Sequence, residues 1–175
     1  MRFVDFLKTT VLLSAGSATI LAALTVVGAS HGGHPAVALG SIGWWLAASV
    51  LGLVIGRRSE ANPPIARLLA GARTTSSLPE PRPNLILLNR LWPLILVTLG
   101  AAGLSVLAPQ VPGIVTGLPI ILALSWRRQE AAVAAIEERD GVQFHVERTS
   151  PVRPMVLLRS TGFRAVRPQQ LSDSV

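Results

Sequence analysis

Four apolar segments, and the placement of the basic residues around them, constrain the fold of this chain more than any other feature. Lipid offers no hydrogen-bond partner to a polypeptide backbone, so an apolar segment that crosses it must be helical. About 20 apolar residues are enough for one crossing. We therefore predict an all-α membrane protein with a four-transmembrane-helix bundle, built from two helical hairpins. The expected spans run from about Thr9 to Gly28, Pro35 to Gly56, Leu91 to Ala108 and Pro112 to Trp126.

The sixteen Lys and Arg residues all lie before the first segment, between the second and third, or after the fourth. The turns from Ala29 to His34 and from Pro109 to Val111 carry no Lys, Arg, Asp or Glu. Loops rich in Lys and Arg stay in the cytoplasm. We therefore expect both termini and the linker, residues 57–90, to be cytoplasmic. Interface anchors are predicted at Arg57, Arg58, Arg90, Trp92, Trp126, Arg127 and Arg128.

Composition indicates the cell and the compartment. Arg outnumbers Lys fifteen to one, and Ala, Gly, Val and Leu abound. This usage is typical of a GC-rich bacterial genome, so we expect a multi-pass protein of the bacterial cytoplasmic (cell) membrane. The net charge of +7 is dispersed and lacks interleaved aromatic residues, which favours lipid headgroups over nucleic acid as its partner. The absence of cysteine excludes disulfides and thiolate metal sites.

The first span has an alternative interpretation as a secretory signal peptide. The segment from Met1 to Lys8 resembles the charged region of such a peptide, and Val27 to Ala29 resembles a small-residue cleavage site. The apolar run is longer than the usual apolar region of a signal peptide, which favours an uncleaved helix.

The spans and the linker form one predicted domain, residues 1–128. In the linker, Pro63 and Pro64 can open a helix, and Ile65, Leu68, Leu69 and Ala72 share one face of it. We expect this small cytoplasmic helix to lie at the membrane interface, and an extended connector to follow it from Thr74 to Pro83. A bend is expected near Pro93 in the third span.

The second predicted unit is a cytoplasmic tail, residues 129–175. One helix is expected from about Pro112 to Arg139, kinked at Pro119, protruding beyond Trp126 and ending at Asp140-Gly141. A β-hairpin should follow. Its docking face is Val142, Phe144 and Val146, which alternate with Gln143, His145 and Glu147. Met155 to Leu158 would supply the second strand, and disorder is expected from about residue 167.

Side chains that could carry chemistry are scarce. The four apolar segments contain no Asp, Glu, Lys, Arg or His, whereas ion-coupled transporters place ionisable groups at depth. His31 and His34 are weak metal candidates, because two ligands fall short of a structural zinc site. Glu137, Glu138 and Asp140 are interpreted as a solvated helix face.

Two further patterns point to packing or to binding. GxxxG motifs at Gly52 and Gly56, and at Gly113 and Gly117, permit close helix contact within this chain or with a partner. Trp44 and Trp45 lie near the middle of the second span, where tryptophan is uncommon. Such a pair either packs in the bundle or contacts a lipid or a partner helix.

These observations lead to a non-catalytic function without a cofactor. We expect an integral membrane accessory, scaffold or assembly subunit, not an enzyme. Its partners would be membrane lipids and other membrane proteins, or copies of itself, and not nucleic acid. The alternative is a small oligomeric transporter or lipid-handling protein without ion coupling.

Overall fold

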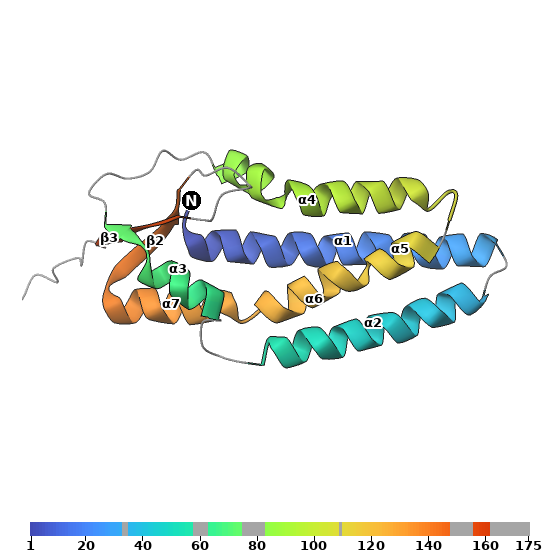
Figure 1. Ribbon diagram of the computed structural model, residues 1–175, viewed down its shortest axis with the longest axis horizontal. Helices are drawn as coiled ribbons and strands as arrows, with labels where there is room; N and C mark the ends of the chain where they lie inside the picture. Colours follow the sequence, from blue (N-terminus) through green and yellow to red (C-terminus); the bar gives the residue numbers. More distant parts are fainter. Residues whose placement is uncertain (33–34, 58–62, 75–82, 109, 148–155, 162–175) are drawn as a thin grey trace, which may run out of the picture.

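A computed structural model describes residues 1–32, 35–57, 63–74, 83–108, 110–147 and 156–161. The protein is mostly helical. Three helices are long and apolar enough to cross a membrane: α1 (Phe3–His31), α2 (Pro35–Ile55) and α4 (Pro83–Leu104). They run side by side along the long axis of the molecule (Figure 1). The tail from about residue 167, which we expected to be disordered, lies outside the described residues. Met155, where the second strand was expected to begin, also lies outside them.

The fourth apolar segment is divided into two short helices, α5 (Gln110–Val115) and α6 (Gly117–Trp126). They follow one another alongside α1 and α2 (Figure 1). Pro119 explains the division at Thr116. Its ring nitrogen cannot donate to the carbonyl of Val115, and proline crowds the carbonyl four residues before it. The helical bonds on either side survive, from Thr116 N to Pro112 O and from Ile120 N to Thr116 O.

The prediction of one helix from Pro112 to Arg139 is wrong. Besides the division at Thr116, the chain turns at Arg127 and Arg128 before α7 (Gln129–Asp140) begins. The turn lets α7 place Val133 in an apolar cluster described below. The predicted stop after Asp140 is confirmed: Gly141 adopts a left-handed φ of 64°, and its N–H caps the carbonyl of Glu137.

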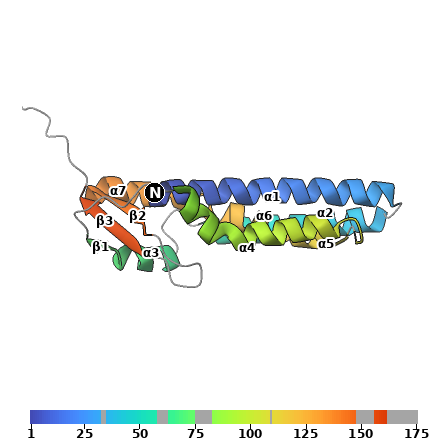
Figure 2. The same cartoon turned by 90° about the horizontal axis from the view of Figure 1, so that it is seen from above.

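The third long helix starts earlier than the apolar pattern indicated. α4 includes Asn84 to Arg90, which we expected to precede the span, and it continues through Pro93 without interruption. Figure 2 shows α4 bent within its N-terminal half, and Pro93 lies at the end of that half. Proline bends a helix without ending it when neighbouring turns keep their hydrogen bonds.

The helices do not separate into two hairpins. α6 packs between α1 and α2, and its contacts with each exceed those between α1 and α2 themselves. α4 lies against α1 and α5. Residues 110–126 therefore hold the other helices together, which local turn lengths alone did not predict.

A small sheet lies at one end of the bundle (Figures 1 and 2). Its strand order is β1-β3-β2, with β1 (Arg73–Thr74), β2 (Val142–Val146) and β3 (Leu157–Thr161). β2 and β3 are antiparallel, and Val142 pairs with Thr161. β3 begins at Leu157 and extends past Leu158, so the second strand lies later than predicted. β1, whose second residue begins the expected extended connector, pairs parallel to β3.

The sheet, α3 (Pro63–Ala70) and α7 together form what we call the charged end of the molecule. An apolar cluster in the charged end brings together residues from the whole chain. Its buried members are Phe3, Phe6, Leu7, Ile65, Ile86, Val133, Val142, Phe144, Val146 and Leu157. The linker helix α3 (Pro63–Ala70) is present as predicted, and Leu68, Leu69 and Ala72 pack against the cluster. The sheet therefore gains the cover that an isolated hairpin lacks. α1 supplies Phe3, Phe6 and Leu7 to that core.

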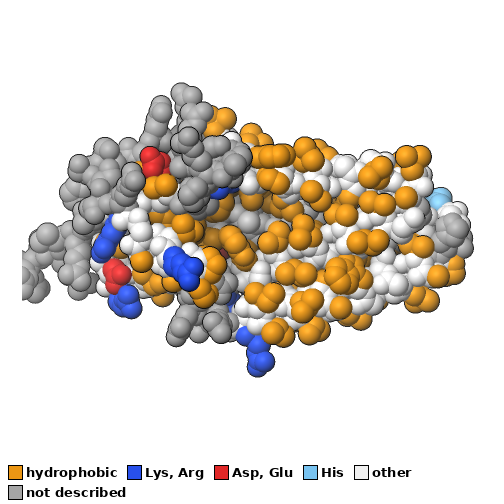
Figure 3. All heavy atoms as spheres, in the orientation of Figure 1, with side chains coloured by type: hydrophobic (Ala, Val, Ile, Leu, Met, Phe, Trp, Pro, Cys, Tyr) orange, Lys and Arg blue, Asp and Glu red, His pale blue; other side chains and the backbone are white. Residues whose placement is uncertain are grey.

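The surface of the long helices is apolar. At least 60 % of the surface of each of five leucines is exposed: Leu12, Leu39, Leu46, Leu96 and Leu99. Figure 3 shows hydrophobic side chains spread over this part of the molecule, whereas Lys, Arg, Asp and Glu gather at the charged end and beside it. This distribution is that of helices whose outer faces contact lipid.

Candidate functional site

Two adjacent tryptophans of α2 bind the backbone of α5. Trp44 Nε1 donates to the carbonyl of Ile114, and Trp45 Nε1 donates to that of Gly113, both at 2.9 Å. An indole N–H in hydrocarbon needs such an acceptor. These bonds explain why tryptophan is tolerated at mid-span. Trp44 remains 41 % exposed, so one edge of its ring faces the surroundings of the bundle.

The four GxxxG glycines lie at contacts within this chain. A Cβ added at Gly117 would overlap the indole of Trp44, and one added at Gly113 would overlap Ser41 Oγ. Nearer the C-terminal ends of α2 and α6, a Cβ at Gly52 would lie 2.8 Å from Leu124 Cβ, and one at Gly56 would overlap the Leu124 carbonyl. Each pair therefore brings α2 close to the α5–α6 segment, as small residues do in membrane helices.

A crevice of about 200 Å³ opens beside Trp44 between α2 and α5. Most of its surface is apolar; Ser41 and Gln110 supply polar groups. The described part of its wall consists of Ala36, Val37, Gly40, Ser41, Trp44, Gln110, Gly113 and Ile114. Its size suits part of an alkyl chain and falls below the usual range for a drug-sized ligand, about 300–1,000 Å³.

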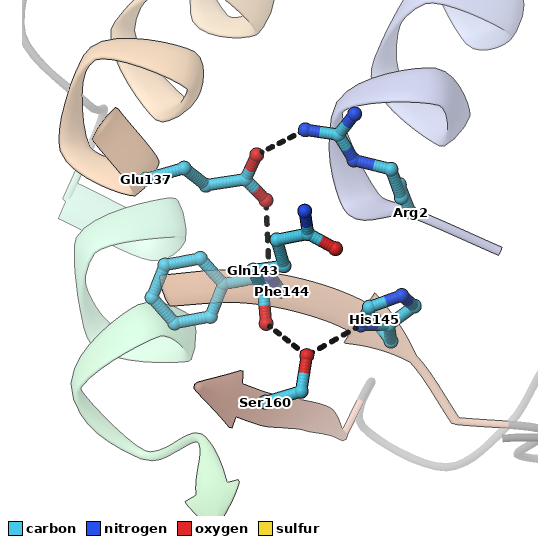
Figure 4. Close-up of polar contacts among 6 residues, drawn as sticks. All are labelled: Arg2, Glu137, Gln143, Phe144, His145 and Ser160. Carbon is cyan, nitrogen blue, oxygen red and sulfur yellow. Dashed lines mark hydrogen bonds and ion pairs between the residues drawn. The ribbon is translucent and has the colours of Figure 1, made fainter. Parts of the chain in front are cut away.

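A buried carboxylate organises the charged end (Figure 4). Glu137 of α7, only 6 % exposed, accepts a hydrogen bond from Arg2 Nη2 through Oε2 at 2.7 Å. Its other oxygen, Oε1, accepts the backbone N–H of Phe144 at 2.9 Å. Both carboxylate oxygens are thus satisfied, as burial of a charge requires. Our interpretation of Glu137 as part of a solvated face is wrong; Glu138 and Asp140 are exposed.

The first residues of the chain extend the sheet at its β2 edge. The N–H of Val146 donates to the carbonyl of Met1 at 3.0 Å, and Arg2 forms an antiparallel bridge with His145. An edge strand exposes unpaired backbone groups, and here the N-terminus covers them. Both ends of the described chain therefore pair with β2 at the charged end.

His145 is buried, contrary to the alternation expected of β2. Val142, Phe144 and Val146 are buried as well, and Gln143 alone in this strand is exposed. Met1 and Arg2 pair with this edge of β2, so they lie beside His145, which explains the difference. Ser160 Oγ lies 3.4 Å from His145 Nδ1 and donates to the Gln143 carbonyl at 3.4 Å (Figure 4). Burial, and then the positive charge of the N-terminal amine, lower the pKa of His145.

The predicted interface anchors fall at several places. Arg57 follows α2, Trp126 ends α6, and Arg127 and Arg128 form the turn before α7. Arg128 Nη1 donates to the carbonyl of Arg57 at 3.2 Å. Arg90 and Trp92 lie in α4, where Trp92 borders a hollow with Leu85, Leu88 and Asn89. Arg58 is outside the described residues.

Of the two weak metal candidates, the structure describes only His31. His31 closes α1, and its Nδ1 lies 2.9 Å from the carbonyl of Val27, while His34 lies outside the described residues. Within the parts of the chain that the structure describes, no group of three or more His, Cys, Asp or Glu residues is placed to hold a metal ion.

Comparisons with known proteins add no relative. No family model matches the chain, and no curated protein or solved structure is significantly similar to it.

Sequence reasoning missed the link between Arg2, Glu137 and the N–H of Phe144. A signal for Glu137 was present: it follows Val133 and Ile136 at the spacing of one helical face. The pairing of Met1 and Arg2 with β2 had no local signal, because it joins opposite ends of the sequence.

Proposed function

We propose that this protein is a non-catalytic accessory, scaffold or assembly subunit of a bacterial cell membrane, and that it binds other membrane proteins or copies of itself. The observation that carries the proposal is the division between a bundle and a charged end. The apolar segments contain no ionisable side chain, and the buried polar groups of the charged end serve its own fold. Such a molecule offers surfaces and not a reaction centre.

In this proposal α5 and α6 together make a fourth crossing, and both termini and the charged end lie in the cytoplasm. The support is the distribution of basic residues and the path of α5 and α6 alongside α1 and α2 (Figure 1). Reporter fusions test the topology. Fusions after Arg73 and after Gln129 should report the cytoplasm, and a fusion after Gly33 should report the outside. An external signal at Arg73 would contradict the proposal.

The GxxxG glycines already contact other helices of this chain, so partner helices would have to contact other small residues. An added Cβ would meet no atom within 4 Å at Gly16 of α1, at Gly40 or Gly43 of α2, or at Gly100 or Gly103 of α4. A partner helix can approach closely at such faces. These three faces, not the GxxxG pairs, are therefore the ones to test for partner binding.

The experiment is purification of the tagged chain in mild detergent, with partners quantified by mass spectrometry. We expect stoichiometric protein partners, or a defined homo-oligomer. Leucine substitutions at Gly16, at Gly40 with Gly43, and at Gly100 with Gly103 should release the partner from one face and not from the others. Loss of binding from none of the three would argue against docking through small-residue faces.

The alternative is a lipid-handling protein or small transporter without ion coupling. The crevice beside Trp44 favours it, because its mainly apolar wall could hold part of an alkyl chain. Widening the crevice by Trp44→Ala would then change the lipids that co-purify with the protein. Unchanged lipids, together with stoichiometric protein partners, would leave the accessory role as the better account.

A further inference from the structure

Three arginines gather where the bundle meets the charged end. Arg57 directly follows the last turn of α2, and Arg127 and Arg128 form the turn between α6 and α7. The ends of α2 and α6 touch, because Gly56 lies against the backbone of Leu124 and Ser125. The hydrogen bond from Arg128 Nη1 to the Arg57 carbonyl joins the two positions directly.

The Arg128 guanidinium uses one of its five N–H donors in that bond, and its other donors and the guanidinium groups of Arg57 and Arg127 can face a ligand. All three residues are exposed. The ion pairs found among the described residues, Arg2 with Glu137 and Arg139 with Asp140, do not involve them. Figure 3 shows Lys and Arg side chains at the end of α2 and around the adjoining charged end. Guanidinium groups bind phosphate oxygens in bidentate geometry, so the chemistry favoured by this cluster is that of a phosphate.

The position of the three arginines next to Trp126 indicates that the phosphate belongs to a lipid headgroup. Trp126 precedes Arg127 directly, and tryptophan marks the headgroup region of a bilayer. Below the cluster lie the apolar outer faces of α2 and α6, with Leu51, Val54 and Ile55 of α2 exposed. A ligand there would contact cations at one end and apolar side chains along the rest. An anionic phospholipid has that chemistry.

We infer that Arg57, Arg127 and Arg128 form a binding site for the headgroup of an anionic phospholipid, with its acyl chains along α2 and α6. The inference rests on the proposed membrane placement but not on the accessory role. The turn at Arg127 and Arg128 brings Arg128 into hydrogen-bond contact with Arg57. Each basic residue near an anionic surface contributes about 1 kcal/mol, or roughly fivefold in affinity.

The test compares thermal unfolding of the purified full chain in nanodiscs of phosphatidylcholine alone and with phosphatidylglycerol or cardiolipin added. The test variant is Arg57→Ala/Arg127→Ala/Arg128→Ala. The control is Arg67→Ala/Arg139→Ala/Arg159→Ala, which removes the same charge from exposed positions elsewhere. We expect anionic lipid to stabilise the native chain and the control. The test variant should unfold as the native chain does in phosphatidylcholine, and should lose most of the stabilisation by anionic lipid.

A second variant separates a headgroup site from general attraction. Arg57→Lys/Arg127→Lys/Arg128→Lys keeps the charge but not the bidentate geometry, and should retain part of the stabilisation. Equal stabilisation of all variants by anionic lipid would overturn the inference. Equal stabilisation by inorganic phosphate in phosphatidylcholine nanodiscs would also overturn it, because the cluster would then recognise a free anion. If the proposed membrane placement is wrong, the reporter fusions will show it separately.

Discussion

Arg2 and Glu137, 135 positions apart in the sequence, form an ion pair of 2.7 Å at the charged end of the bundle. Arg2 is about half exposed, and Glu137 is buried. Solvent therefore screens the Arg2 side of the pair, whereas the buried Glu137 carboxylate needs its hydrogen-bond partners. The larger effect comes from Glu137, which also accepts the buried N–H of Phe144.

Glu137→Leu should loosen the charged end. It leaves the N–H of Phe144 without its acceptor, at a cost of about 1–3 kcal/mol. Glu137→Gln retains an oxygen acceptor and should cost less. The measurement is hydrogen exchange of residues 142–146 in detergent, with Glu138→Leu, at an exposed position, as the control. Equal exchange in the two leucine variants would show that Glu137 has no such role.

Phe144→Asp should disrupt the charged end, because it places a charge in a dry apolar cluster, at a cost of several kcal/mol. His145→Asp should also be damaging, since His145 is buried. Gln143→Asp, on the exposed position between Val142 and Phe144, should be mild. Limited proteolysis of membranes should show rapid tail cleavage in the first two variants only. Membrane insertion should be unchanged in all three.

Gly117→Ala should destabilise the bundle. The new methyl group would overlap the indole of Trp44, and overpacking of this kind costs about 1–3 kcal/mol. Gly100→Ala is the control, because nothing lies within 4 Å of an added Cβ there; it should be neutral, or slightly stabilising through helix propensity. Thermal unfolding in detergent measures both. A neutral Gly117→Ala would mean that Trp44 does not lie over this glycine.

Acid should weaken the charged end through His145. Burial and the N-terminal amine lower the pKa of His145 in the folded state, Arg2 acts in the same direction, and Glu137 opposes them. Below the unfolded-state pKa, about 6.5, the unfolded chain binds a proton that the folded chain resists. Stability should therefore fall as the pH drops below about 6.5 and level off below the folded-state pKa.

The comparison that tests this pH dependence is His145→Gln. Proteolysis of the native tail should accelerate as the pH falls from 7.5 to about 5.5, the range in which an ordinary histidine titrates. The variant should show a flatter profile over the same range. Identical profiles would assign the pH dependence to another group.

Local patterns predicted the features that depend on short sequence separations. The apolar windows of α1 and α2, the face of α3 with Ile65 and the stop at Gly141 all follow from hydropathy, periodicity and glycine geometry. The three-strand order did not follow, because β1 and β3 are far apart in sequence. His145 was misassigned for the same reason: a period of two describes a strand with one open face, whereas Met1 and Arg2, distant in sequence, lie beside His145.

The turn between α6 and α7 shows a different limit. Helix propensity favoured one rod from Pro112 to Arg139, but tertiary contacts decided otherwise. α7 gains the burial of Val133 only after the turn at Arg127 and Arg128. Propensity cannot predict such a turn, since no residue there forbids a helix.

The pairing of Met1 and Arg2 with β2 sets an order for biosynthesis. The ribosome makes the first residues long before Val146, so their strand partners do not exist while α1 and α2 are being made. The core of the charged end includes Leu157 and can close only after translation has passed that residue. Synthesis of the long helices and closure of this core are thus successive stages, and a nascent chain stalled before β3 would expose Phe3 and Phe6 to chaperones and proteases.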